Sequence, residues 1–73
     1  MDKFNIGDYG RFKFILIKNG YETPFDLCAE IIDIDRHYIL LLDNDNIEYL
    51  PRKTDIKDFE AGIKPGKHLL STV

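Results

Sequence analysis

Hydrophobic and polar residues follow one another along this chain in short runs of the length typical of β-strands. At the start of residues 11–18, Phe12 and Phe14 fall on one face while Arg11 and Lys13 fall on the other. Both faces become apolar toward the end of the segment. The alternation predicts a first strand whose aromatic face points into the core.

The stretch 27–45 holds eight of the nineteen Ile, Leu and Val residues of the chain and predicts a long hairpin. Residues 27–34 are rich in β-branched and aliphatic side chains, and residues 38–42 (YILLL) form an unbroken apolar run. Short apolar runs bounded by turn residues favour buried strands over helices. The polar break 35–37 has hairpin length, and the Asp and Asn residues at 43–46 predict the next turn.

Turn-forming and strand-breaking residues elsewhere in the chain predict the other connections. Asn19-Gly20 is a strong hairpin signal, because both residues accept a positive φ. Pro24 cannot donate a backbone hydrogen bond, so we expect residues 21–24 to extend this loop. Residues 47–50 predict a short fourth strand that ends at Pro51.

Residues 52–59 carry the only helical pattern in the chain. Thr54 or Asp55 could cap a single turn. We therefore expect one 3₁₀ turn, followed by a last strand over residues 59–63. Residues 64–73 form either a tail or an extra strand.

Five short strands, tight polar turns and a one-turn helix before the last strand resemble the small-barrel superfold of SH3-like, Sm-like and Tudor-like domains. The resemblance rests on Ile6-Gly7-Asp8, on the hairpin of residues 30–42 and on Thr54-Asp55-Ile56. It implies an all-β, five-stranded SH3-like small barrel. A fold-level likeness of this kind carries little function with it.

Length and composition predict one folded domain over residues 1–73. A hydrophobic fraction of 44% is ordinary for a globular chain. Cys28 is the single cysteine, so no internal disulfide forms, as is usual in a reducing compartment. Because we find neither a signal peptide in residues 1–10 nor a run long enough to span a membrane, we expect a cytoplasmic protein.

The charge distribution argues against a dedicated binder of double-stranded DNA, which usually has a basic excess. The formal net charge is −3. One basic residue, Arg36, lies among eight acidic residues in the middle of the chain: Glu22, Asp26, Glu30, Asp33, Asp35, Asp43, Asp45 and Glu48. More basic segments flank this acidic middle.

Two Asp pairs raise the question of a metal site. Asp33-x-Asp35 and Asp43-x-Asp45 both lie at strand ends near turns. A calcium loop of the EF-hand type would need further ligands, a glycine and a distal Glu in register, and these are absent. We interpret the four residues as turn formers and expect no metal.

Catalytic residues are not evident either. Cys28 and His37 lack a third group to orient them, and Cys28 lies in an apolar strand, where a free cysteine usually acts as a small hydrophobe. His37 is expected to be a turn residue. We therefore expect neither an enzyme nor a cofactor.

Apolar residues on both faces of two strands predict a contact with a partner. Alternate residues in the run 38–42 cannot all point to one core, and residues 15–17 raise the same problem. Either the tail with Leu69, Leu70 and Val73 covers the second face, or another chain does, as a protein partner or in a homo-oligomer. The candidate interaction residues are Tyr38, Ile39, Leu41, Ile15 and Ile17.

The alternative is a small barrel that binds single-stranded nucleic acid through its first strand. Cations that follow phosphates and rings that stack on bases would carry such binding. The candidate residues are Tyr9, Arg11, Lys13 and Lys18. The leading expectation remains a non-catalytic interaction module.

Overall fold

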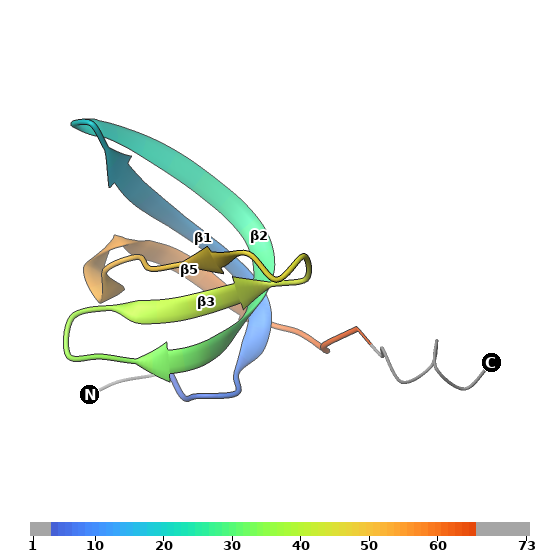
Figure 1. The fold of residues 1–73 in the computed structure, drawn as a ribbon. Helices are drawn as coiled ribbons and strands as arrows, with labels where there is room; N and C mark the ends of the chain where they lie inside the picture. The colour runs from blue at the N-terminus through green and yellow to red at the C-terminus, as the bar shows by residue number, and fades with distance from the viewer. Residues whose placement is uncertain (1–3, 66–73) are drawn as a thin grey trace.

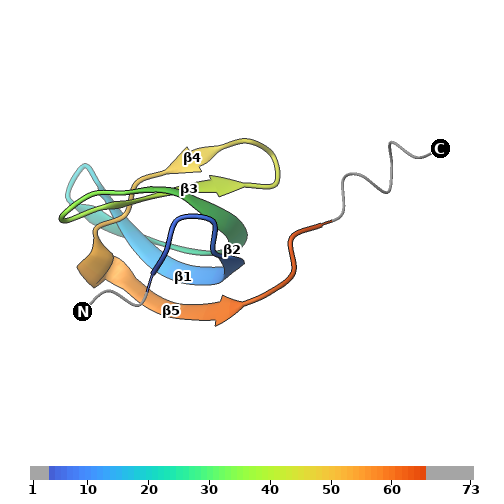
Figure 2. The same cartoon turned by 90° about the horizontal axis from the view of Figure 1, so that it is seen from below.

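The computed structural model describes residues 4–65, which form one antiparallel sheet of order β4-β3-β2-β1-β5 (Figures 1 and 2). The elements are β1 (Tyr9–Lys18), β2 (Tyr21–Ile34), β3 (Ile39–Asp43), β4 (Glu48–Tyr49), the 3₁₀ turn η1 (Lys53–Asp55) and β5 (Ile56–Ala61). The predicted all-β class, with five strands and a 3₁₀ turn before the last, is confirmed. A closed barrel is not shown, because the edge strands β4 and β5 do not pair with each other in the described part of the chain.

β1 and β2 form a long hairpin that projects beyond the other strands, at the upper left of Figure 1. Its turn is the predicted Asn19-Gly20, with φ angles of 52° and 81°. Asn and Gly accept these left-handed angles more readily than other residues. β5 pairs with β1 only as far as Phe14, and β3 pairs with β2 only from Ala29 onward. The distal part of the hairpin therefore has an open edge on each side.

Pro24 lies inside β2, so the loop expected over residues 21–24 is wrong. β2 begins at Tyr21, and Pro24 lies opposite Ile15 of β1. A proline is tolerated here because β2 has no second neighbour at this position. Proline is disfavoured in a central strand, whereas this part of β2 is an edge.

The core is built on the predicted aromatic face of β1. Phe12 and Phe14 are almost completely buried. Phe12 stacks on Phe59 with ring centroids 4.5 Å apart, and Phe14 stacks on Phe25 at 5.3 Å. Tyr49 adds an edge-to-face contact with Phe14 at 5.7 Å. These contacts join four strands through their inward side chains.

β3 shows which face of the run 38–42 points inward. Ile39 and Leu41 are completely buried, whereas Leu40 and Leu42 are partly buried on the opposite face. The core thus takes one alternate set of the run.

The connection from β4 to β5 differs in detail from the expectation. The fourth strand is shorter than residues 47–50, and Pro51 follows in a buried position. Arg52 is the N-cap of η1 and makes no side-chain cap hydrogen bond, so capping by Thr54 or Asp55 is wrong.

The last strand begins directly after η1, at Ile56, instead of at residue 59, and ends at Ala61. Ile63 lies beyond the strand and is 94% exposed. The described chain continues away from η1, toward the opposite side of the sheet (Figures 1 and 2). Residues 66–73, and with them the suggested cover by Leu69, Leu70 and Val73, lie outside the described residues.

Candidate functional site

Apolar residues from three separate parts of the chain line one hollow of about 290 Å³. They come from the end of β1, the β2–β3 turn and the link between β4 and η1, which lie on one side of the molecule in both views (Figures 1 and 2). Tyr38, Ile17 and Leu50 are 38%, 52% and 53% exposed. We call this hollow the apolar groove, and its apolar walls are Ile15, Leu16, Ile17, Tyr38, Leu50 and Pro51.

Backbone contacts hold two walls of the apolar groove together. Tyr38 forms an isolated antiparallel bridge with Arg52. The amide of Lys53 donates to the carbonyl of His37 at 2.8 Å. The β2–β3 turn is thereby fixed against the β4–η1 link, so the backbone sets the position of Tyr38.

The third wall is the open edge of β1. The carbonyl of Tyr9 accepts a hydrogen bond from the amide of Gly62 at 3.0 Å, on the β5 side of β1. Backbone groups alternate in direction along a strand, so the N–H and C=O groups of Ile15 and Ile17 face the same side. Pairing with β5 ends at Phe14. The groove is therefore bordered by a strand edge that has no strand partner in the described part of the chain.

The residues predicted to meet a partner fall into two groups. Ile15, Ile17 and Tyr38 line the apolar groove. Ile39 and Leu41 have no exposed surface, because they face the core. These two residues cannot present a surface to a partner, and the candidate site is corrected accordingly.

Leu50 was not singled out from the sequence, although it is as exposed as Ile17. It follows the short strand β4 and precedes Pro51, a position that has no distinctive local pattern. Its place in the groove depends on the bridge between Tyr38 and Arg52, which joins segments distant in the sequence. An apolar residue directly before a strand-ending proline is the only signal that could have drawn attention to it.

A second hollow, of about 410 Å³, adjoins the apolar groove. Tyr38 and Arg52 line both. No acidic side chain of the described residues lines this second hollow. We call it the basic pocket, and it is lined by Arg36, His37, Tyr38, Arg52, Lys53 and Thr54.

An ion pair lies at the boundary between the two hollows. The Arg52 guanidinium donates to both oxygens of Asp55, at 2.8 Å and 3.3 Å. The hydrogen bond and the charge of Asp55 raise the pKa of Arg52. The pair neutralises the acid that lines the apolar groove.

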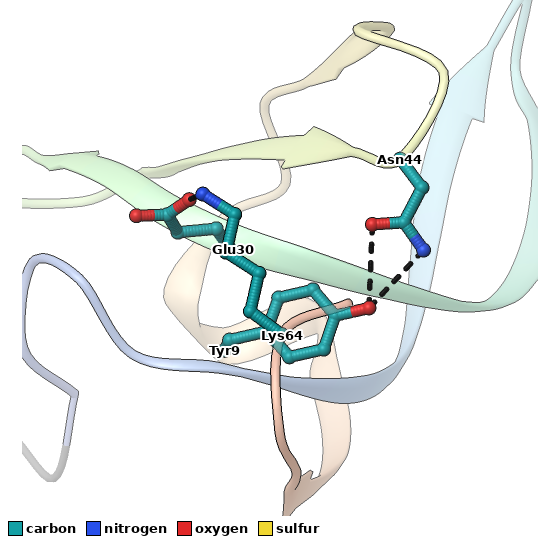
Figure 3. A network of polar contacts seen from close by, with 4 residues as sticks. All are labelled: Tyr9, Glu30, Asn44 and Lys64. Carbon is teal, nitrogen blue, oxygen red and sulfur yellow. Dashed lines mark hydrogen bonds and ion pairs between the residues drawn. The ribbon is translucent and has the colours of Figure 1, made fainter. Parts of the chain in front are cut away.

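The ring of Tyr9, predicted for the nucleic-acid alternative, is held in a polar network (Figure 3). Its hydroxyl accepts a hydrogen bond from the Asn44 amide at 3.1 Å and can donate to the Asn44 oxygen at 3.3 Å. Nearby, Lys64 pairs with Glu30 at 2.5 Å. Tyr9 is partly buried, so its ring is less accessible to a base than the sequence suggests.

The basic side chains of β1 lie among acids. Arg11 forms a two-pronged ion pair with Asp26, at 2.6 Å and 2.8 Å. This hydrogen bonding raises the pKa of Arg11 and lowers that of Asp26. Lys13 is in register with Asp26 on β2 and with Asp58 on β5. Lys18 lies near the hairpin turn and, by strand alternation, on the other face.

Asp43 acts as a turn former, as predicted. Its carboxylate accepts hydrogen bonds from the amides of Asp45 and Ile47, at 2.8 Å and 2.9 Å, and from the Tyr49 hydroxyl at 2.9 Å. These bonds close the β3–β4 turn. Within residues 4–65, no cluster of three or more His, Cys, Asp or Glu side chains is placed to hold a metal ion.

Cys28 is exposed, which corrects its interpretation as a small hydrophobe in an apolar strand. It lies opposite Arg11 on the outer face of the sheet, whereas its neighbour Ala29 is completely buried. Strand alternation explains the difference. His37 lies in the β2–β3 turn as expected.

No helix long and apolar enough to cross a membrane occurs among residues 4–65. No family model, curated protein or solved structure matches the chain.

Proposed function

We propose that this protein is a non-catalytic interaction module that binds an extended segment of a protein partner in the apolar groove. One observation carries the proposal. Apolar residues from segments far apart in the sequence, three of them between 38% and 53% exposed, line one hollow. Apolar surface gathered in this way is commonly a binding site.

The open edge of β1 supports an extended partner. Unpaired N–H and C=O groups at a strand edge can pair with an added strand, and neighbouring hollows then accept its side chains. Ile15 and Ile17 supply such backbone groups and also line the groove. Backbone pairing contributes affinity and the apolar walls contribute specificity.

We infer in addition that the sheet is of the SH3-like small-barrel kind. The support is the set of five antiparallel strands, the polar turns and the 3₁₀ turn directly before the last strand. This assignment concerns the fold alone and does not bear on the choice of partner.

The proposal is tested by selecting binders from a displayed library of random dodecapeptides. We expect enriched peptides to lose affinity about tenfold or more for Leu50→Ser, because they bury the Leu50 side chain. Ile47→Ser is the matched control: Ile47 is 51% exposed but does not line the groove. Peptides that bind all three proteins equally would refute the groove as the site.

Self-association is the other protein contact predicted from the sequence. It can be tested with the same Leu50→Ser variant. Sedimentation velocity of wild type and of Leu50→Ser over a range of concentrations measures it directly. A wild-type dimer that Leu50→Ser dissociates would identify a second copy of the chain as the occupant of the groove. Under the present proposal both proteins remain monomeric.

A further inference from the structure

We propose that the partner segment is an acidic peptide, with apolar side chains in the apolar groove and a carboxylate in the basic pocket. This inference rests on the proposed function and adds the chemistry of the partner. The inference comes from the positive charge of the basic pocket, which differs from the net negative charge of the chain.

The basic pocket is an exception in an acidic protein. The chain has a formal charge of −3, yet three cationic side chains line this hollow: Arg36, Arg52 and Lys53. Arginine pairs with carboxylates through two parallel hydrogen bonds, so such a site favours a carboxylate ligand.

Two acids close in sequence to the pocket residues already accept hydrogen bonds. Asp55 pairs with Arg52. Asp35 accepts a hydrogen bond from the backbone amide of Arg36 at 2.5 Å. The Arg36 guanidinium itself forms no ion pair with any residue in 4–65. Arg36 is therefore placed to pair with a charge from outside the chain.

The two hollows are arranged so that one ligand can reach both. Tyr38 and Arg52 line each of them, so the two hollows adjoin at these two residues. A peptide that pairs with the β1 edge beside Ile17 runs along the apolar walls toward this boundary. Its next side chain then meets the cations.

A single-stranded nucleic acid fits these two hollows less well. Phosphates would suit the basic pocket, but the apolar groove offers one ring, Tyr38, and one cation, Arg52, which is already paired with Asp55. A phosphate backbone has no apolar side chains that could fill the apolar groove. We therefore favour a peptide and treat the oligonucleotide as an outcome of the test.

The experiment uses the dodecapeptide selection and two charge variants of the full chain. Arg36→Glu reverses a charge in the basic pocket. Lys57→Glu makes the same change in net charge on β5, outside both hollows. Each selected peptide is also synthesised with its Asp and Glu residues replaced by Asn and Gln, and affinities are measured at low and physiological salt.

We expect selected peptides to carry Asp or Glu next to apolar residues. Arg36→Glu should weaken their binding about tenfold, because a charge-assisted contact is lost and a repulsion is added. The amide versions should bind wild type more weakly and be insensitive to Arg36→Glu. Lys57→Glu should bind like wild type, and salt should reduce the affinity of the acidic peptides alone.

The outcomes separate the two proposals. Peptides that need Leu50 but carry no acidic residue, or that bind Arg36→Glu normally, would overturn this inference and leave the proposed function standing. A selection without Leu50-dependent peptides would overturn both. A single-stranded oligonucleotide that binds wild type and loses affinity for Arg36→Glu would assign the basic pocket to nucleic acid and overturn the peptide inference.

Discussion

Gly10 is the residue at which the sheet leaves no room for a side chain. A Cβ atom there would lie 2.2 Å from the backbone oxygen of Glu60 and 2.6 Å from the ring of Phe59. The first neighbour is backbone in a paired strand, which cannot move away without breaking the β1–β5 ladder. We expect Gly10→Ala to lower the free energy of unfolding by about 1–3 kcal/mol, measured by urea denaturation.

Gly62→Ala is the control for this prediction. A Cβ at Gly62 would meet its nearest atom, the Cα of Gly10, at 3.7 Å, which is an ordinary contact. We expect this variant to unfold like wild type. Equal stabilities for Gly10→Ala and wild type would show that β5 lies farther from β1 than described.

Asp43 makes the stability of the β3–β4 turn dependent on pH. Three hydrogen bonds lower the pKa of Asp43 below its ordinary value of 3.8. The largest effect comes from the amide of Ile47, and smaller ones come from the Tyr49 hydroxyl and the amide of Asp45. The folded protein thus binds this proton less tightly than the unfolded chain does. The carboxylate stabilises the fold at neutral pH, and the stabilisation is lost as the pH falls through the lowered pKa.

We expect Asp43→Asn to be less stable than wild type at pH 7, with a difference that shrinks below about pH 4. The measurement is the midpoint of urea unfolding for both proteins between pH 7 and pH 2. Asp45→Asn makes the same charge change in the same turn but leaves the Asp43 carboxylate in place. A difference that stays constant down to pH 2 would contradict a role for the Asp43 charge.

At the scale of elements, the sequence predicts strands well where one face alone is apolar. The alternation that starts at Phe12 and Phe14 correctly identifies the buried face of β1. The Asn19-Gly20 turn is also correct, because its positive φ angles are a local property. Both predictions depend on residues that are neighbours in the chain.

Predictions fail where distant segments decide the result. The run 38–42 has no period of two, so only pairing with β2 and the bridge from Tyr38 to Arg52 select Ile39 and Leu41 for the core. The same bridge brings Leu50 to the groove. The sequence therefore indicated Tyr38 and the end of β1 as parts of the candidate site, but it did not indicate Leu50.

Pro24 protects an open strand edge. Its partner Ile15 directs its backbone groups away from β2, so the nitrogen of Pro24 points to the unpaired side of β2. Over Tyr21–Cys28 this side has no strand neighbour in residues 4–65. A proline at such an edge hinders pairing with another chain.

We therefore expect Pro24→Thr to self-associate, because it restores a hydrogen-bond donor and adds a β-branched side chain at the edge. Sedimentation velocity over a concentration series should show wild type as a single species and the variant as a mixture of monomer and larger species. A variant that remains monomeric at the highest concentration would contradict the protective role of Pro24.

At the scale of the whole molecule, charges on the outer face of the sheet alternate in rows. Arg11 and Lys13 on β1 lie between acids of the two neighbouring strands. The acids are Asp26 on β2 and Asp58 and Glu60 on β5. The five side chains carry two positive and three negative charges, so this face attracts phosphate weakly.

We expect wild type not to bind a labelled single-stranded oligonucleotide, even at low salt. The triple variant Asp26→Asn, Asp58→Asn, Glu60→Gln keeps both cations and removes the acids beside them. It should bind the oligonucleotide with an affinity that falls steeply as salt rises, since binding to phosphates releases counterions. Fluorescence anisotropy at low and physiological salt measures both proteins.

Binding by wild type would reverse the order of the two function proposals, and two variants would then locate the site. Loss of binding in Arg11→Ser would place phosphate on the outer face of the sheet, despite the ion pair of Arg11 with Asp26. Loss in Arg36→Glu would place it in the basic pocket, on the side of the molecule where the β2–β3 turn and η1 lie. Arg11 lies on the sheet, whereas the basic pocket is lined by the β2–β3 turn, Arg52 and η1, so the two variants show which of the two sites holds the phosphates.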